Sequence, residues 1–140
     1  MAWAITFYRS DAGTVPAREF LASCPTNVRR KLLVILEVVR VAPPPSFSGG
    51  GMWEAMHGTM NGYYEIRATG PGRRHYRLYC ILDNGTRAEL KERGFDEPHI
   101  VVLNGLVKPN ASLFSDADYR RHVRRLGEHY RSTLPRPVAA

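Results

Sequence analysis

The sequence has few of the residues that bind metals or form disulfide bonds. Cys24 and Cys80 are its only cysteines, and they lie far apart in apolar surroundings. A zinc site usually shows clustered cysteines and histidines, whereas the five histidines here are scattered, so no metal site is expected. Two isolated cysteines favour reduced thiols in the core over a disulfide, which indicates a cytoplasmic protein.

Long apolar runs and familiar catalytic motifs are missing as well. No segment approaches the roughly 20 apolar residues that a membrane-spanning helix needs, and the start MAWAITFYRSD lacks a basic region followed by an apolar stretch. The phosphate-binding glycine loops, the metalloprotease helix and the nucleophile motif of acyl-transfer enzymes do not occur. Membrane insertion, export and a cofactor are therefore not expected.

Lysine is scarce, because 17 of the 20 basic residues are arginines. The formal net charge is +7 and the isoelectric point is near 9.8. Such a balance favours polyanionic partners such as nucleic acid, although a generic basic surface would give the same totals. Arginine strengthens the first interpretation, since its planar group binds phosphate bidentately and stacks on bases.

A chain of 140 residues with 44% hydrophobic content is predicted to form one globular domain. The domain is expected to span residues 1–132, and the tail TLPRPVAA, residues 133–140, is expected to be disordered. No internal repeat is visible. The order strand, helix, helix, several strands, helix predicts an α+β fold, in which two N-terminal helices pack on a mainly antiparallel sheet of about four strands and a further helix closes the chain.

The N-terminal half is predicted to contain one strand and two helices. Residues 3–8 form an aromatic and β-branched run that indicates a strand. Pro16 and Pro25 suit the first turns of two helices. From Val28 the second of these places apolar residues at helical spacing, and although its many valines also allow a strand, its length and flanking prolines favour a helix.

The C-terminal half shows a buried strand and two helix starts. Residues 100–103 form a continuous apolar run, typical of a strand that is buried on both faces. Thr86 and Glu89 have the spacing of a capping box and indicate a short helix, although an irregular loop is an alternative. Ser115 begins the closing helix, whose outer face is predicted to be basic through Arg120, Arg121, Arg124 and Arg125.

The most informative stretch is 62–82, GYYEIRATGPGRRHYRLYCIL, which reads as two strands around the turn Gly70-Pro71-Gly72. Side chains alternate across a strand, so each strand separates into two faces. One predicted face is apolar, with Tyr64, Ile66, Ala68, Tyr76, Leu78, Cys80 and Leu82. The other carries Tyr63, Glu65, Arg67, His75, Arg77, Tyr79 and Ile81.

On that second face, Arg67 can lie opposite or diagonal to Arg77. Directly opposed like charges destabilise a sheet by a fraction of a kcal/mol, on the order of 0.5, which suggests that an anion sits between them. A phosphate group is the natural candidate. The alternative is that Glu65 pairs with one arginine in an ordinary lattice of surface charges.

Further cations are expected close to this pair. Lys108 ends the apolar strand, and Arg73 and Arg74 flank the hairpin turn. RNA cleavage through attack by its own 2′-hydroxyl needs groups that stabilise a charged phosphorane-like state, which cations do directly. The predicted catalytic residues are Arg67, Arg77 and Lys108, and the predicted RNA-binding residues are Tyr63, Arg73, Arg74, His75 and Tyr79.

Several of these motifs together resemble a known family. Tyr64-Glu65-Ile66-Arg67, Tyr76-Arg77-Leu78-Tyr79 and the apolar strand that ends in Lys108, set between an N-terminal strand and a closing basic helix, are similar to the phage-derived HigB-like toxins of the RelE/ParE superfamily. The resemblance covers nearly the whole chain.

The resemblance implies the toxin of a type II toxin-antitoxin system. Such a toxin is a ribosome-dependent endoribonuclease that cleaves messenger RNA in the ribosomal A site and is neutralised by a HigA-like antitoxin. Arg67 and Arg77 would bind the scissile phosphate, and Lys108 would add a further positive charge. The antitoxin usually carries a helix-turn-helix, so operator DNA would be bound only through the antitoxin.

Two other functions stay open at this point. The superfamily also contains ParE-like members that inhibit DNA gyrase and cut nothing, and they share the scaffold. A basic module that acts only inside a regulatory complex with a partner protein and DNA would show the same composition.

Overall fold

A five-stranded sheet forms the centre of the structure, a computed structural model that describes residues 2–41, 52–108 and 114–139. Its elements are β1 (Ala4–Phe7), α1 (Pro16–Ser23), α2 (Thr26–Val41), β2 (Trp53–Ala55), β3 (Tyr64–Thr69), β4 (His75–Asp83), α3 (Arg87–Glu92), β5 (His99–Lys108), α4 (Asp116–Tyr119), the π-helix η4 (Arg120–Arg124) and α5 (Arg125–Ser132). The strand order is β1-β5-β4-β3-β2, and only β1 and β5 pair in parallel among these strands.

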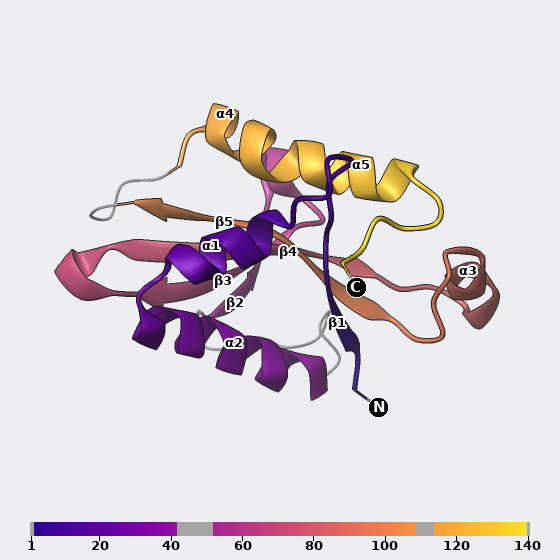
Figure 1. Ribbon diagram of the computed structural model, residues 1–140, viewed down its shortest axis with the longest axis horizontal. Helices are drawn as coiled ribbons and strands as arrows, with labels where there is room; N and C mark the ends of the chain where they lie inside the picture. The colour runs from indigo at the N-terminus through magenta and orange to yellow at the C-terminus, as the bar shows by residue number, and fades with distance from the viewer. Residues whose placement is uncertain (1, 42–51, 109–113, 140) are drawn as a thin grey trace.

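This arrangement confirms the predicted α+β class with a mainly antiparallel sheet. The two N-terminal helices cover one face of the sheet, and the segment from α4 to α5 covers the other (Figure 1). The sheet has one strand more than the expected four or so. Two short strands form the opposite edges of the sheet. The four-residue β1 pairs with β5, and the three-residue β2 pairs with β3.

The first core lies between the sheet and the N-terminal helices. It contains the apolar hairpin face as predicted, including Ile66, Leu78 and Cys80, which are fully buried. From α2 it receives Leu32, Leu36 and other residues at helical spacing, so the valine-rich segment is a helix. The two cysteines are buried free thiols, in agreement with the sequence.

The second core lies on the opposite face of the sheet. The sequence predicted that this face is charged and open to RNA, but helices cover part of it. Tyr63, Tyr79 and Ile81 of the supposed polar face pack with Val123 and Tyr130 of the C-terminal helical segment. Leu103 and Val101 of β5 complete the cluster, whereas Ile100 and Val102 face the first core. The strand β5 is therefore buried on both faces, as its apolar run predicted.

Two irregularities of the backbone meet under the C-terminal helical segment. The register between β4 and β5 shifts between Tyr79 and Cys80, which is a β-bulge. The π-helix η4 interrupts the helical segment nearby. Asn104 joins them, because its Nδ2 donates to the His122 carbonyl oxygen at 3.1 Å and its Oδ1 accepts from the Gly105 amide at 2.8 Å. Bulges and π-turns are frequent beside functional sites, since both redirect side chains.

The capping box predicted at Thr86 and the helix start predicted at Ser115 are both present, and each forms a capping box. Thr86 and Glu89 cap α3, and Ser115 and Asp118 cap α4. Arg124 differs from the expected basic outer face, because its guanidinium forms a bidentate contact with Asp116 at 2.9 and 3.1 Å. Arg120, Arg121 and Arg125 are exposed, as expected.

Residues 133–139 are fixed by contacts, which differs from the predicted disordered tail. Val138 forms a β-bridge with Tyr8, and the Ala139 amide donates to the Phe7 carbonyl oxygen at 2.8 Å. Arg136 donates through Nε to Asp83 at 3.3 Å. The position of this segment at the C-terminal end predicted disorder, but its backbone and side-chain donors find partners in β1 and at Asp83.

Asp83, at the end of β4, holds several segments together. It is 5% exposed and accepts a hydrogen bond from the Tyr130 hydroxyl at 2.6 Å. Arg93, just after α3, donates to it at 2.6 Å, and Arg136 approaches from the tail. One buried carboxylate thus connects the sheet with α3, α5 and the C-terminal segment.

Among the described residues, no helix is long and apolar enough to cross a membrane.

We expect Asp83→Asn to lower the free energy of unfolding by about 3 kcal/mol, because it removes a buried charge that pairs with two partly buried arginines, Arg93 and Arg136. Urea denaturation followed by circular dichroism measures this. The exposed Asp96→Asn is the matched control, for which a change below about 0.5 kcal/mol is expected. Equal losses for the two variants would contradict the proposed role of Asp83.

Candidate functional site

The strand register places the predicted catalytic residues in one row. Arg67 of β3 lies directly opposite Arg77 of β4, and His75 of β4 lies opposite Lys108 of β5. His75 and Arg77 are two residues apart on one strand, so all four belong to the same face of the sheet. The tip of the hairpin and the end of β5 extend beyond the start of α4 (Figure 1). We call Arg67, Arg77, His75 and Lys108 the cationic row.

Glu65 supplies a negative charge beside this row. The Arg67 Nη2 lies 2.6 Å from the Glu65 Oε1, and Nε donates to the same oxygen at 2.8 Å. Glu65 is 7% exposed, so the pair is partly buried, in contrast to the solvated lattice considered from the sequence. One carboxylate faces two arginines, which leaves the arginine pair with a net positive charge.

Arg77 is the less accessible of the two arginines. Its side chain is half-buried, and Nη1 donates to the Tyr76 carbonyl oxygen at 3.1 Å. Burial lowers the pKa of Arg77; Glu65 acts in the opposite direction, and Arg67 lowers it further. An arginine stays charged despite such a shift, so an incompletely compensated cation lies within a sheet face.

The outer end of the row is more open. His75 and Lys108 are partly exposed, and the Lys108 Nζ lies 5.2 Å from the centre of the Phe114 ring. Arg73 and Arg74 are exposed at the hairpin turn, where the Gly70 amide donates to the Arg74 carbonyl oxygen at 2.9 Å. These residues can reach a bound polyanion from the tip of the hairpin.

Tyr63 and Tyr79 do not lie where RNA bases can stack on them, so their predicted role is wrong for this structure. Tyr79 is completely buried, and Tyr63 is 6% exposed. The Tyr63 ring packs against Gly127 of α5, where any Cβ would collide with it, and Arg131 covers it at 5.8 Å. Alternation assigned both tyrosines to the correct face, but the sequence did not show that a helix covers that face.

Tyr119, the last residue of α4, is a neighbour of the site that the sequence did not assign to it. Its ring packs edge-on against Tyr79 at 5.7 Å and against Phe114 at 6.0 Å. Burial raises the pKa of Tyr119, and Glu65 raises it further while Arg77 and Arg67 lower it, so this hydroxyl shares the electrostatic field of the row. The sequence predicted a helix that begins at Ser115, but not which end of the sheet this helix covers.

The Tyr79 hydroxyl lies below Tyr119 in an unusual environment. It is buried and forms no hydrogen bond of good geometry with the described residues, although Tyr119 is close enough to affect its ionisation. Burial raises the pKa of Tyr79 far above the ordinary value, so this hydroxyl stays protonated. A buried polar group without a partner destabilises a fold, and such groups often mark places where a site needs a particular shape or donor.

Taken together, the row can hold a phosphate group. Two opposed arginines with one compensating carboxylate favour an anion between them, and a lysine and a histidine lie one step further along the same face. No group of three or more metal-ligating side chains occurs in the described parts of the chain.

No family model, no curated protein and no solved structure matches the chain.

Two substitutions, Tyr79→Phe and Tyr130→Phe, test whether the buried Tyr79 hydroxyl lacks a hydrogen-bond partner. Tyr79→Phe removes a group that has lost its hydration without gaining a partner, so we expect the free energy of unfolding to rise by about 1 kcal/mol. Tyr130→Phe removes a hydrogen bond to the Asp83 carboxylate, so we expect a decrease of about 2 kcal/mol. Chemical denaturation of both variants and the wild type provides the measurement.

The two variants control for each other, since each deletes one hydroxyl from a buried ring. A loss of stability in Tyr79→Phe similar to that in Tyr130→Phe would mean that the Tyr79 hydroxyl is satisfied in solution.

Proposed function

We propose that the protein is an endoribonuclease toxin of the HigB-like type, which cleaves messenger RNA on the ribosome and is held inactive by a helix-turn-helix antitoxin. The observation that carries this proposal is the direct opposition of Arg67 and Arg77 across β3 and β4, with the buried carboxylate of Glu65 paired to Arg67. The resemblance of the hairpin motifs to that family supports it, as does the formal charge of +7.

Cleavage would use the RNA as its own nucleophile. The 2′-hydroxyl loses its proton, its oxygen forms a bond to the adjacent phosphorus, and the bond from phosphorus to the 5′-oxygen breaks. The products are a 2′,3′-cyclic phosphate and a 5′-hydroxyl that takes up a proton. Negative charge accumulates on the phosphate oxygens in between, where fixed cations stabilise it most.

The row offers groups for these steps. Arg77 is held by the sheet and its Tyr76 contact, so it suits a fixed phosphate ligand. Arg67 is 44% exposed at its side chain and would exchange Glu65 for a phosphate oxygen. His75 faces Lys108 across the strands and would contact the phosphate from the open end of the row. Arg73 and Arg74 would contact flanking phosphates.

Arg67→Ala and Arg77→Ala should each lower the cleavage rate about 100-fold, because each removes a donor that stabilises the transition state. Primer extension on messenger RNA recovered from cells after a short induction measures the cut sites, and growth arrest gives a second readout. Arg121→Ala is the matched control, since this exposed arginine lies on the covering helix. Circular dichroism confirms that each variant is folded.

The outcomes distinguish the functions that the sequence left open. If messenger RNA stays intact in cells that show double-strand DNA breaks, the protein acts as a ParE-like gyrase inhibitor and not as a ribonuclease. Harmless expression without breaks would favour a basic module that acts only in a regulatory complex. Equal cleavage by wild type and the Arg67→Ala, Arg77→Ala pair would show that the assigned residues are wrong.

A further inference from the structure

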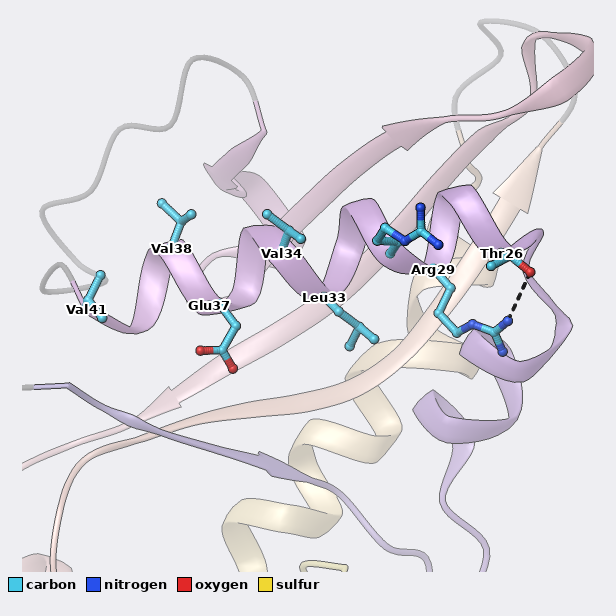
Figure 2. A pocket seen from close by; sticks show the side chains of 8 residues that line it. Thr26, Arg29, Leu33, Val34, Glu37, Val38 and Val41 are labelled. Carbon is cyan, nitrogen blue, oxygen red and sulfur yellow. Dashed lines mark hydrogen bonds between the residues drawn. The ribbon is translucent and has the colours of Figure 1, made fainter.

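The outer surface of α2 carries a second apolar stripe that no part of the described chain covers. Seven large hydrophobic side chains are exposed among the described residues, and five of them lie together here: Leu33, Val34, Val38, Val41 and Met52. Figure 2 shows Val34 and Val38 pointing to the same side of the helix. The core stripe of α2 is separate, so the helix is apolar on two sides. A helix that is apolar on two sides is normally buried on both sides.

This stripe borders a groove between α2 and the edge of β3. The groove has a volume of about 550 Å3 and continues onto the outer surface of the helix. Val34 and Val38 line both parts. Their spacing of four residues, followed by Val41 after three, matches the pattern with which one helix packs along another. We call this surface the α2 groove.

The rim of the α2 groove is strongly basic. Arg29, Arg30 and Lys31 of α2 and Arg67 of β3 line it, and Glu37 is the one carboxylate among its described lining residues. Glu65 pairs with Arg67, so the three basic residues of α2 supply most of the excess positive charge. Glu37 is already paired with Arg40 at 3.3 Å, and Arg29 contacts Thr26, as the dashed line in Figure 2 shows. An occupant therefore meets an apolar floor between cations.

The charge decides between two classes of occupant. A second copy of this chain would bring the same excess of cations to the same rim, and like charges across an interface oppose association. An acidic partner gains from each of them. We propose that the α2 groove binds an amphipathic helix of a partner protein, whose apolar residues contact Val34 and Val38 and whose flanks are acidic.

Arg67 links this groove to the cationic row. It lines the groove and also lies opposite Arg77, so an acidic residue of the bound helix would compete with phosphate for the same guanidinium. Occupation of the groove would thereby weaken anion binding on the row. This second step rests on the proposed function, whereas the docking itself does not.

A synthetic peptide tests the docking directly. The probe is a fluorescein-labelled helix of about five turns with leucines at i, i+3, i+4 and i+7 and glutamates on both flanks. Fluorescence anisotropy measures its affinity for the full chain. The matched peptide carries lysines in place of the glutamates. We expect saturable binding of the acidic peptide and about tenfold weaker binding of the basic one.

Variants locate the binding surface. The double variant Val34→Ser, Val38→Ser should weaken the acidic peptide about tenfold or more without changing the melting temperature, because both side chains are exposed. Leu134→Ser is the matched control, since Leu134 is 63% exposed at the C-terminal end and should leave affinity unchanged. Arg67→Ala should weaken the peptide severalfold, whereas the exposed Arg121→Ala should not.

Each contrary result removes the proposal. Absence of binding by the acidic peptide, or equal binding of the acidic and basic peptides, would overturn it. So would a concentration-dependent dimer in analytical ultracentrifugation that Val34→Ser, Val38→Ser abolishes, because a second copy would then occupy the groove.

A competition experiment separates the docking from the proposed function. Single-stranded RNA that is displaced by the acidic peptide from the wild type, but not from Val34→Ser, Val38→Ser, would support the coupling through Arg67. Peptide binding by a protein that leaves messenger RNA uncut in the primer-extension assay would leave the docking intact and remove the ribonuclease proposal. Simultaneous binding of both would disprove the coupling.

Discussion

The register of β3 against β4 is the constraint on which the candidate site depends. It places Arg67 opposite Arg77 and Glu65 opposite Tyr79, while Ile66 and Leu78 meet in the first core. A slip of one residue would exchange the two faces of β3, burying arginine against α2 and exposing isoleucine. The fully buried pair Ile66 and Leu78 excludes that slip, so apolar packing on one face fixes the charges on the other.

Much of the fold was predictable because it depends on local patterns. Alternation separated the two faces of the hairpin, and the capping residues Thr86 and Ser115 marked two helix starts correctly. The sequence did not predict the fixed C-terminal segment. Its bridge from Val138 to Tyr8 joins residues 130 positions apart by backbone hydrogen bonds, which leave little trace in side-chain composition. The parallel pairing of β1 with β5 is a contact of the same kind.

Of the candidate site, only the positions of the basic residues could be predicted from the sequence. Alternation and the apolar strand that ends at Lys108 are enough to bring four basic residues onto one face. The errors at Tyr63 and Tyr79 have one cause: the sequence shows that a residue leaves the first core, but not whether a second layer covers it. Gly127 allows Tyr63 to contact α5, and the bulge and π-turn joined by Asn104 adapt the covering helix to the sheet. These depend on tertiary packing.

Glu65 explains how the sheet accommodates two directly opposed arginines. Directly opposed arginines repel, and a fully compensated pair would have no remaining attraction for phosphate. One buried carboxylate bound at 2.6 Å to the more exposed arginine gives an intermediate state: the sheet tolerates the pair, and a net positive charge remains. Arg67 is thus the residue whose contacts can change. Because it borders both the cationic row and the α2 groove, either surface can alter the other by engaging this one guanidinium.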